Sequence, residues 1–239
     1  MKGVLLAGGT GSRLSPLTKI TNKHLLPVYD RPMIYYPIET LRKAGITEIL
    51  LIAGKGHAGD FLELLGSGQE LGVNLSYEVQ EHPGGIAHAL KMAETFVDGE
   101  AFTVVLGDNV YCDSLSEQIQ GFVKSGNGAH VFLKEVEEPE SYGVARFDEE
   151  GRLTEIVEKP SNPPSSYAVT GCYCYEAGVF DLLRHIQPSA RGEMEISDVN
   201  DHYAKVGRLS HSILQDFWGD CGESIDGLLE VAHTLKQRA

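Results

Sequence analysis

The chain has 239 residues, of which 42% are hydrophobic and 23% are charged, and this composition excludes disordered and collagen-like proteins. Its aliphatic runs are far shorter than the roughly 20 apolar residues that span a bilayer, and its apolar amino-terminal stretch is too short for a secretory signal. The formal net charge of −14 argues against binding to a nucleic-acid backbone. We therefore expect a cytoplasmic protein with no membrane and no nucleic-acid partner.

The first 110 residues alternate apolar strands with helices. Strands are predicted over 2–7, 48–53, 75–79 and 102–106, and helices over 32–44, from 61 to 65 and over 86–96. Pro37 is an irregular feature inside the first helical pattern. Because the strands are largely apolar on both faces, the pattern predicts a mainly parallel α/β sheet flanked by helices, with ligands beyond the carboxyl ends of the strands.

The pattern changes after residue 130. Four segments, over 130–136, 142–147, 153–158 and 168–175, are typical of β-ribbons joined by acidic and proline-rich turns, and we expect a lid laid over the sheet edge. Helices over 179–185, 196–206 and 225–237 and a strand over 209–214 complete the chain. With no internal repeat and no long linker, a single domain is expected over 1–239.

The distribution of charge and the spacing of the cysteines limit the kinds of binding site that this chain can form. The first 55 residues hold eight basic and three acidic residues, a net charge of +5, whereas the remainder carries −19. This favours a site for a small anion, with an accidental surface imbalance as the alternative. The four cysteines include no C-x-x-C pair and the nine histidines include no H-x-x-x-H pair, so free thiols are expected and a structural zinc site is not.

The most informative segment runs from Leu6 to Leu14 and reads Leu-Ala-Gly-Gly-Thr-Gly-Ser-Arg-Leu. Its three glycines allow backbone amides to approach phosphate oxygens without obstruction by a Cβ, and the guanidinium of Arg13 follows. The spacing matches neither a Walker A loop nor a dinucleotide fingerprint. Taken alone, the segment would be interpreted as an ordinary glycine-rich turn.

Further motifs accompany this segment along nearly the whole chain. Together they resemble the sugar-1-phosphate nucleotidylyltransferases, and within that family the members that use dTTP and glucose 1-phosphate. The motifs are Pro16-Leu17-Thr18, Asn22 to Val28, Arg31-Pro32-Met33, Tyr35-Tyr36-Pro37, Leu106 to Asn109, Glu158-Lys159-Pro160, Val169-Thr170-Gly171, Arg191-Gly192-Glu193 and Trp218 to Gly222.

The resemblance implies that an oxygen of glucose 1-phosphate attacks the α-phosphorus of dTTP, giving dTDP-glucose and pyrophosphate, the first step toward dTDP-rhamnose or related deoxysugars. Such chemistry depends on positioning and charge neutralisation. A UTP-dependent enzyme or one for another hexose 1-phosphate is the alternative, because one methyl group contributes only about 1 to 3 kcal/mol of discrimination. A noncatalytic sugar-nucleotide sensor is a more distant alternative.

The resemblance also assigns roles to residues. Arg13 would hold the departing pyrophosphate and Lys23 would neutralise charge at the α-phosphoryl group, with surface salt bridges as the alternative for both. Gln80 and Gly85 would read the base, and a packing role is the alternative for Tyr142, Val169 and Tyr173. The nucleotide-binding candidates are Leu6, Gly8, Gly9, Thr10, Gly11, Ser12, Arg13, Lys23, Gln80, Pro83, Gly85 and Asp108. The sugar-phosphate-binding candidates are Asn109, Tyr142, Gly143, Glu158, Lys159, Val169, Tyr173 and Arg191.

Asp108 and Asp220 are the candidate metal ligands. Asp108 follows the strand over 102–106, and Asp220 follows Trp218-Gly219. Mg²⁺ prefers oxygen ligands and usually takes one or two carboxylates together with substrate phosphates and water. Without a cation, two carboxylates beside a phosphate loop would repel each other and the triphosphate, so we expect Mg²⁺. The alternative is that Asp108 caps a helix and Asp220 stabilises a turn.

The fold implied by the resemblance is a single Rossmann-like nucleotidyltransferase domain with a mixed, mainly parallel sheet and a sugar-binding β-ribbon lid. Residues 1–110 would bind the nucleotide, and residues 111–239 would bind the sugar phosphate and supply the carboxyl-terminal helices. A homo-oligomer, either a dimer or a tetramer, is also implied. The chain departs from longer members at His24 and His88, where glutamine is common, and at Cys221, where threonine is common. It also ends soon after the helix over 225–237, where those members continue into a helical extension that helps form a secondary nucleotide site.

Overall fold

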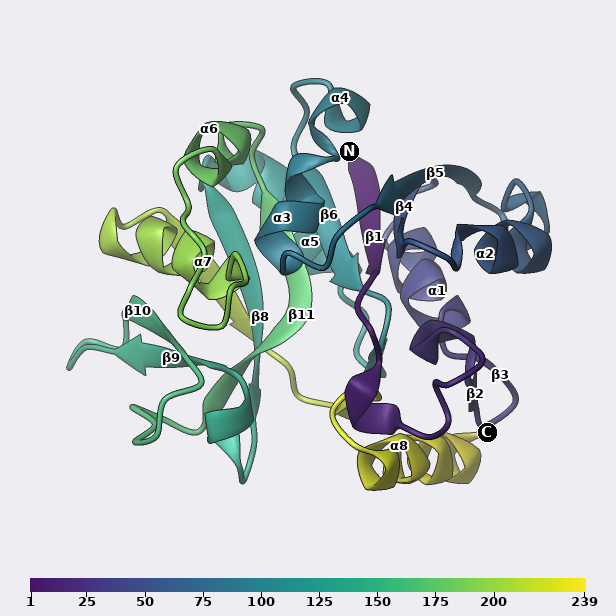
Figure 1. Cartoon of the computed structure of the whole chain (residues 1–239). Coiled ribbons are helices and arrows are strands. Elements are labelled where there is room, and N and C mark those ends of the chain that lie inside the picture. The colour runs from purple at the N-terminus through teal and green to yellow at the C-terminus, as the bar shows by residue number, and fades with distance from the viewer.

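The apolar strands of the amino-terminal half form the centre of a nine-stranded sheet (Figure 1). In the computed structural model, which describes residues 1–239, they pair in parallel in the order β6-β1-β4-β5. Their carboxyl ends therefore meet at one edge, as predicted. The four strands are β1 (Lys2–Ala7), β4 (Glu48–Gly54), β5 (Asn74–Gln80) and β6 (Phe102–Leu106).

The second half of the chain extends the same sheet. Strand β11 (Tyr167–Tyr175) pairs antiparallel with both β6 and β8 (Ala129–Glu135), and β12 (Leu209–Ile213) pairs in parallel with β8. The hairpin of β9 (Gly143–Phe147) and β10 (Leu153–Glu158) projects from this sheet, as Figure 1 shows, and joins it through β11.

Two of the four segments expected in a lid therefore belong to the central sheet. Strand β8 is buried on its first five residues and β11 on all but its first, whereas β9 and β10 have only two buried residues each. A strand that is buried on both faces lies inside a layered sheet rather than over its edge. Only the β9–β10 hairpin is a projecting ribbon.

Helices cover both faces of the sheet and produce two separate cores. Alternate residues of β1 point to opposite sides, with Val4 and Leu6 in one core and Leu5 and Ala7 in the other. The first core includes α3 (Ile86–Lys91), α6 (Val179–Leu183) and α7 (Ile196–Lys205), with α4 (Glu94–Val97) after α3. The second core includes α1 (Tyr35–Lys43), α2 (Ala58–Leu65) and α5 (Ser116–Ser125).

Two predicted helices differ from their expected bounds. Helix α1 begins at Tyr35 rather than at 32, which places Pro37 in the first turn, where a missing N–H costs no intrahelical hydrogen bond. The helix predicted over 86–96 is divided into α3 and α4. At the division the Met92 and Ala93 amides donate to the carbonyls three residues earlier, a tighter pattern that ends α3.

Short elements complete the fold. Helix α8 (Ile225–Arg238) packs beneath them through Leu228 and Val231. The strands are β2 (Pro27–Val28), β3 (Arg31–Pro32), β7 (Asn109–Tyr111) and β13 (Trp218–Asp220), and the 3₁₀ helices are Ser12–Leu14, Lys23–Leu25, Gln69–Leu71 and Pro139–Ser141.

All four cysteines are free, as their spacing predicted, and three of them are buried. None of the helices combines the length and the hydropathy that crossing a membrane requires.

Candidate active site

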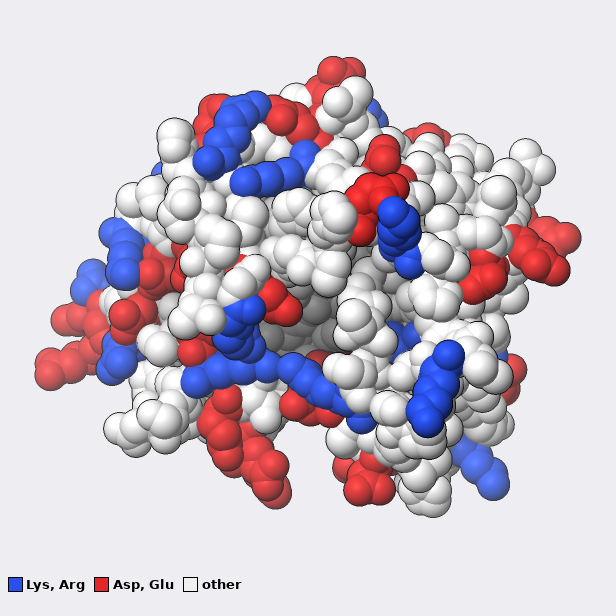
Figure 2. All heavy atoms as spheres, in the orientation of Figure 1, with Lys and Arg blue, Asp and Glu red and all other residues white.

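A cleft of about 380 Å³ opens at the carboxyl ends of β1, β5 and β6. Figure 2 shows a hollow near the middle of this face, with basic and acidic side chains on its rim. Every residue assigned from the sequence to the nucleotide, the sugar phosphate or the metal lines this cleft. The fold therefore gathers motifs from both ends of the chain around one space.

The glycine-rich loop after β1 forms one wall of the cleft. Gly9 and Gly11 have φ values of 89° and 64°, in the left-handed region that favours glycine. A Cβ at Gly11 would lie 2.9 Å from Thr18 Cγ2, and the Thr18 hydroxyl donates to the Gly11 carbonyl at 2.8 Å. The amides of Gly9, Thr10 and Gly11 donate no backbone hydrogen bond. They are available to the oxygens of a phosphate group.

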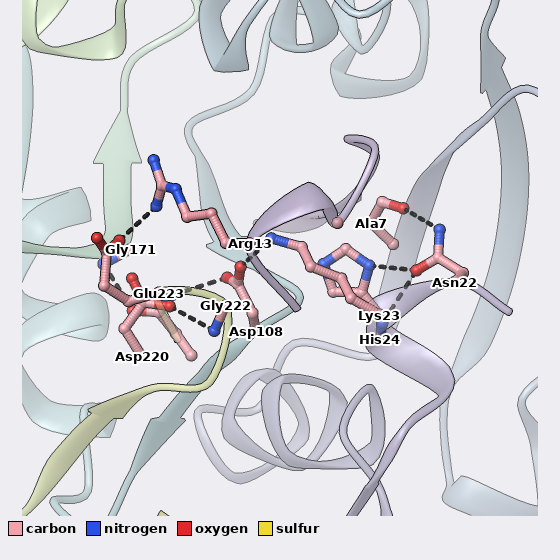
Figure 3. A network of polar contacts seen from close by, with 12 residues as sticks. Ala7, Arg13, Asn22, Lys23, His24, Asp108, Gly171, Asp220, Gly222 and Glu223 are labelled. Atoms are coloured by element: carbon pink, nitrogen blue, oxygen red, sulfur yellow. Dashed lines mark hydrogen bonds and ion pairs between the residues drawn. The ribbon is translucent and has the colours of Figure 1, made fainter. Parts of the chain in front are cut away.

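Arg13 lies at the mouth of the cleft, where its guanidinium pairs with Glu223 (Figure 3). The Arg13 side chain is 51% exposed. An ion pair as exposed as this one is weak, so an anionic ligand can replace the Glu223 carboxylate with little loss of interaction free energy. The arrangement leaves Arg13 near the phosphate loop and able to bind phosphate oxygens.

Lys23 and Asp108 form a buried ion pair on the floor of the cleft. The Lys23 ammonium donates to Asp108 Oδ2 at 2.5 Å (Figure 3), and the two side chains are 18% and 11% exposed. Burial opposes the charge on each group, but the attraction between them outweighs it. The pKa of Lys23 is therefore raised, and the pKa of Asp108 is held below its usual range.

Asp220 approaches the same pair from β13. Strand β13 pairs antiparallel with β7 so that Asp220 lies opposite Asn109, the residue after Asp108. Burial and the negative charge of Asp108 raise the pKa of Asp220 to about 7. A single ammonium thus faces two carboxylates, and the cluster favours an added cation.

The donor set fits a divalent cation that is shared with a ligand. No group of three or more His, Cys, Asp and Glu side chains is placed to hold a metal ion. Asp108 and Asp220 supply two carboxylates, and Mg²⁺ commonly completes such a set with substrate phosphates and water. Asp108 caps no helix, since it lies in the turn between β6 and β7. A Cβ at Gly222 would clash with the Asp108 carboxylate, which explains a glycine there.

Asn109 lines the cleft, yet its side chain is engaged within the protein. Its Oδ1 accepts from the Gly171 amide at 3.0 Å and from Trp218 Nε1 at 2.7 Å, while its Nδ2 donates to Asp108 Oδ1 at 3.0 Å. Asn109 is 1% exposed. It joins β11 and β13 to the Asp108 carboxylate and so positions that group.

Gln80, Pro83 and Gly85 form the end of the cleft near β5. Gln80 is the last residue of β5 and is 5% exposed. Gly85 has a φ of 90°, and a Cβ there would lie 2.6 Å from the Met194 carbonyl oxygen. Only glycine fits this turn, which brings the backbone between β5 and α3 close to the cleft.

The other end of the cleft is lined by charged residues from β10 and from the segment before α7. Arg191 Nη2 donates to Glu158 Oε1 at 2.8 Å and pairs with Glu195 at 2.9 Å. The Ser197 hydroxyl donates to Glu158 Oε2. The Glu158 carboxylate is therefore held from both sides.

Lys159 follows Glu158 in an uncommon backbone conformation. Its φ is 41°, in the left-handed region that non-glycine residues rarely adopt, and its amide donates to the Tyr142 carbonyl at 2.9 Å. Strain of this kind is concentrated at functional positions. Here it accompanies a lysine that lines the cleft beside Glu158.

The residues with an alternative packing role, Tyr142, Val169 and Tyr173, both pack and line the cleft. Tyr142 meets Trp218 edge to face, with ring centroids 5.3 Å apart. Tyr173 is 4% exposed and stacks on Tyr175, and Val169 belongs to the same core. Next to Tyr142, a Cβ at Gly143 would lie 2.8 Å from Ser197 Oγ.

Several residues of the cleft were not predicted. Glu195 and Ser197 contact the predicted Arg191 and Glu158, and Glu223 pairs with Arg13. Each of the three lies a few residues after a recognised motif, and the sequence offers no other signal that it belongs to the cleft. Asn200 also lines the cleft, with Oδ1 accepting from the Tyr175 hydroxyl at 2.5 Å and Nδ2 buried without a partner.

Comparisons with known proteins agree on one family. The sequence model of the family described as "Nucleotidyl transferase" matches residues 2–238. A glucose-1-phosphate thymidylyltransferase of Actinoplanes sp. is 46% identical over 97% of this chain and 77% of its own length. Another from Neisseria meningitidis is 45% identical over 99% of this chain and 84% of its own length.

Solved structures give the same result. A putative glucose-1-phosphate thymidylyltransferase from Bacillus anthracis, solved with sucrose, has a TM-score of 0.91 and 47% identity, and covers 97% of this chain and 95% of its own. A UDP-glucose pyrophosphorylase complexed with UDP-glucose has a TM-score of 0.88 at 27% identity, and covers 100% and 99% of the two chains.

Proposed function

This chain belongs to the nucleotidyl transferase family, and we propose that it transfers the thymidylyl group of dTTP to α-D-glucose 1-phosphate, giving dTDP-glucose and pyrophosphate. Family membership was predicted from the motifs and is confirmed. The thymidylyltransferase names of the relatives, which cover nearly the whole chain, support the choice of dTTP and glucose 1-phosphate.

The observation that carries the proposal is the Lys23–Asp108–Asp220 cluster. It lines one cleft with the unpaired amides of Gly9 to Gly11 and with the Glu158–Arg191 pair. A triphosphate bound to the loop amides would present its α-phosphorus to the cluster. A sugar phosphate bound near Arg191 would then approach from the opposite end of the cleft.

The reaction exchanges one phosphorus–oxygen bond for another. A phosphate oxygen of glucose 1-phosphate supplies the electron pair for the new bond to the α-phosphorus of dTTP. The bond from that phosphorus to the oxygen bridging the α- and β-phosphates breaks, and pyrophosphate leaves with its electron pair. No residue of the chain forms a covalent intermediate, so catalysis rests on placement and charge.

Arg13 and Lys23 stabilise the charge that develops in this step. Lys23 lies on the cleft floor, where its charge interacts strongly with the reacting phosphoryl group because water is largely excluded. Arg13 is at the mouth, near the loop that binds the β- and γ-phosphates, and holds the pyrophosphate as it departs. Glu158 accepts hydrogen bonds from sugar hydroxyls, and Lys159 and Arg191 bind the sugar's phosphate.

A divalent cation, which we take to be Mg²⁺, would be held by Asp108 and Asp220. When bound, it neutralises the triphosphate and polarises its α-phosphoryl group. Asn109 holds the Asp108 carboxylate, and the Gly222 amide donates to Asp220 Oδ1 at 2.8 Å. Both carboxylates are thus oriented by the protein.

Base recognition would fall to Gln80 and Gly85, because an amide side chain and a nearby backbone can match the donors and acceptors of a pyrimidine edge. UTP is the second candidate substrate. The specific observation in its favour is the likeness to a UDP-glucose pyrophosphorylase over the whole chain. Residues 1–110 would bind the nucleotide, and residues 111–239 would bind the sugar phosphate.

We place the reaction in the cytoplasm, a reducing compartment that suits four free cysteines. We also propose a homo-oligomer, a dimer or a tetramer, whose size light scattering would establish.

The test is a pyrophosphate-release assay on the purified protein with Mg²⁺. It crosses dTTP, UTP, ATP, CTP and GTP with the 1-phosphates of glucose, galactose and N-acetylglucosamine. We expect the highest kcat/KM for dTTP with glucose 1-phosphate. A higher value for UTP would select the second candidate, and a folded protein with no activity on any pair would instead support a noncatalytic sensor.

A further inference from the structure

His88 lies directly behind the residue proposed to read the base. It is the third residue of α3 and does not line the cleft. Its Nδ1 lies 2.8 Å from Gln80 Nε2, the amide nitrogen that also approaches the Gly85 carbonyl oxygen at 3.4 Å. Gln80 Nε2 therefore has two contacts within the protein.

These contacts determine which atom of the Gln80 amide faces the cleft. A backbone carbonyl only accepts hydrogen bonds, so the amide atom near Gly85 is the donor nitrogen. The same nitrogen faces His88, whose Nδ1 must then be unprotonated and accept the second N–H. Gln80 Oε1 accepts no hydrogen bond from the protein, and Gln80 lines the cleft. The amide thus offers an acceptor to a ligand.

Two glycines leave room for this amide and imidazole pair. A Cβ at Gly8 would lie 2.8 Å from Gln80 Oε1, so the phosphate loop leaves space for the oxygen. A Cβ at Gly84 would lie 2.7 Å from His88 Cγ and 2.8 Å from its Nδ1. The imidazole is confined beneath the Gly84-Gly85 turn, which limits how far it can rotate away from Gln80.

We propose that His88 is a positioning residue for base selectivity, which orients the Gln80 amide so that its oxygen faces the base. The inference rests on the proposed role of Gln80 in base recognition. The N–H at position 3 of thymine and uracil can donate a hydrogen bond to an amide oxygen. The nitrogen at the same position of cytosine carries no hydrogen and can only accept one. Without His88 the amide can rotate and present its NH₂ group, which cytosine accepts. His88 therefore favours dTTP over dCTP.

The experiment compares His88→Leu with His88→Asn. Leucine fills the space without an acceptor, whereas the asparagine Oδ1 can replace the imidazole Nδ1 as an acceptor. We expect His88→Leu to lower the ratio of kcat/KM for dTTP to that for dCTP by about tenfold, the effect of one lost hydrogen bond. His88→Asn should keep most of the ratio. His185→Leu, at an exposed histidine outside the cleft, is the control and should match the parent.

A binding measurement separates this inference from the proposed function. Calorimetric titration of parent and variants with dTTP and dCTP gives the affinity ratio even in the absence of turnover. A parent that binds dTTP but releases no pyrophosphate would overturn the proposed reaction, while its affinity ratio would still report on His88. Unchanged ratios in folded His88→Leu, in both binding and turnover, would overturn the positioning role. If His88→Leu does not fold, His88→Lys takes its place, because a lysine side chain offers only donors. We expect this variant to lose the preference for dTTP over dCTP, and a retained preference would overturn the positioning role.

Discussion

Lys23 is a buried ammonium that keeps its charge. Removing such a group from water is unfavourable, and its attraction to Asp108 at 2.5 Å compensates for that cost. The pair therefore contributes little to the free energy of unfolding. Its role is to keep a positive charge in the cleft, where a ligand can contact it. Asp220, with a pKa raised to about 7, shows that the two carboxylates are not fully balanced by one lysine.

Lys23→Ala should lower kcat by about 100- to 1,000-fold, because a charge beside the reacting phosphorus contributes most in the transition state. The KM for dTTP should change much less. Steady-state kinetics check this, with Lys19→Ala as the control, since Lys19 is exposed, lies shortly before Lys23 in the chain and does not line the cleft. A variant with normal kcat and only a raised KM would restrict Lys23 to ground-state binding.

Asp220→Asn should abolish most turnover while the free energy of unfolding falls by no more than about 1 kcal/mol. The amide keeps the shape of the carboxylate but supplies no charge for a cation. Activity measured across a Mg²⁺ titration is the test, and Asp226→Asn, at the first turn of α8 and outside the cleft, is the control. Parental activity at the parental Mg²⁺ optimum would exclude Asp220 as a ligand.

Residues within compact motifs were predictable from sequence, but their partners were not. Arg13 and Lys23 belong to recognisable segments whose chemistry suits phosphate. Glu223, which pairs with Arg13, and Ser197, which donates to Glu158, are ordinary polar residues until the fold brings them there. Neither pairing has a local sequence pattern. Asn109, expected to contact the sugar phosphate, lines the cleft, and its side chain also bonds to Gly171 and Trp218, which sequence did not indicate.

At the scale of elements, the end of β10 and the start of α7 form one unit of the cleft. Glu158 at the end of β10 is held by Ser197 in the first turn of α7 and by Arg191 just before it. The Ile156 amide, also on β10, donates to Asp201 Oδ1 on α7 at 3.2 Å. The projecting hairpin is thus tied to the body of the protein at the point where it carries Glu158.

Glu158→Gln should raise the KM for glucose 1-phosphate by at least about tenfold, because a charged acceptor of the sugar hydroxyls and the partner of Arg191 are both lost. The KM for dTTP should stay within about twofold if the nucleotide binds at the other end of the cleft. Glu155→Gln, on the same strand but outside the cleft, is the matched control. Equal effects of the two variants on both substrates would contradict the assignment of Glu158 to the sugar.

Strands with long apolar runs were predicted well, since β1, β4 and β6 are read directly from hydrophobicity. Helix α5 was missed, although Leu115, Ile119 and Phe122 repeat at helical spacing and are buried. The β7–β13 pair could not be predicted, because three-residue strands carry almost no periodicity. That pair nonetheless places Asp220 beside Asp108. The sequence therefore indicated the candidate residues of the site more readily than it indicated the short strands that bring them together.

Across the whole molecule, the sheet contains a buried histidine whose charge the fold disfavours. His130 lies on β8, where burial lowers its pKa to about 4 from a usual value near 6.5. Its Nδ1 lies 2.8 Å from Ser210 Oγ on β12, and its Nε2 is buried without a partner. Since the unfolded chain takes up a proton here more readily than the folded chain, protonation of His130 opposes folding.

Titration of His130 should therefore lower the free energy of unfolding by about 2 kcal/mol between pH 7 and pH 5, whereas Asp220, whose pKa is raised to about 7, changes it in the opposite direction. The His130 contribution is complete above pH 6.5 and is lost as the pH decreases toward 4. His130→Asn, which keeps an acceptor for Ser210 but does not titrate, should lose less stability than the parent on going from pH 7 to pH 5, by the His130 contribution, whereas His185→Asn at an exposed site should match the parent. Denaturant unfolding at both pH values measures this, and parallel curves for His130→Asn and the parent would contradict it.

The central claim is that one cleft transfers a nucleotidyl group from dTTP to glucose 1-phosphate. Phosphorus-31 NMR of the complete reaction tests it most directly, because it distinguishes attack at the α-phosphorus from cleavage at the γ-phosphorus. We predict that the three dTTP signals and the sugar-phosphate signal decrease together, while the paired signals of dTDP-glucose and the signal of pyrophosphate appear in equal amount. Unchanged glucose 1-phosphate, or dTDP with inorganic phosphate in place of pyrophosphate, would contradict it.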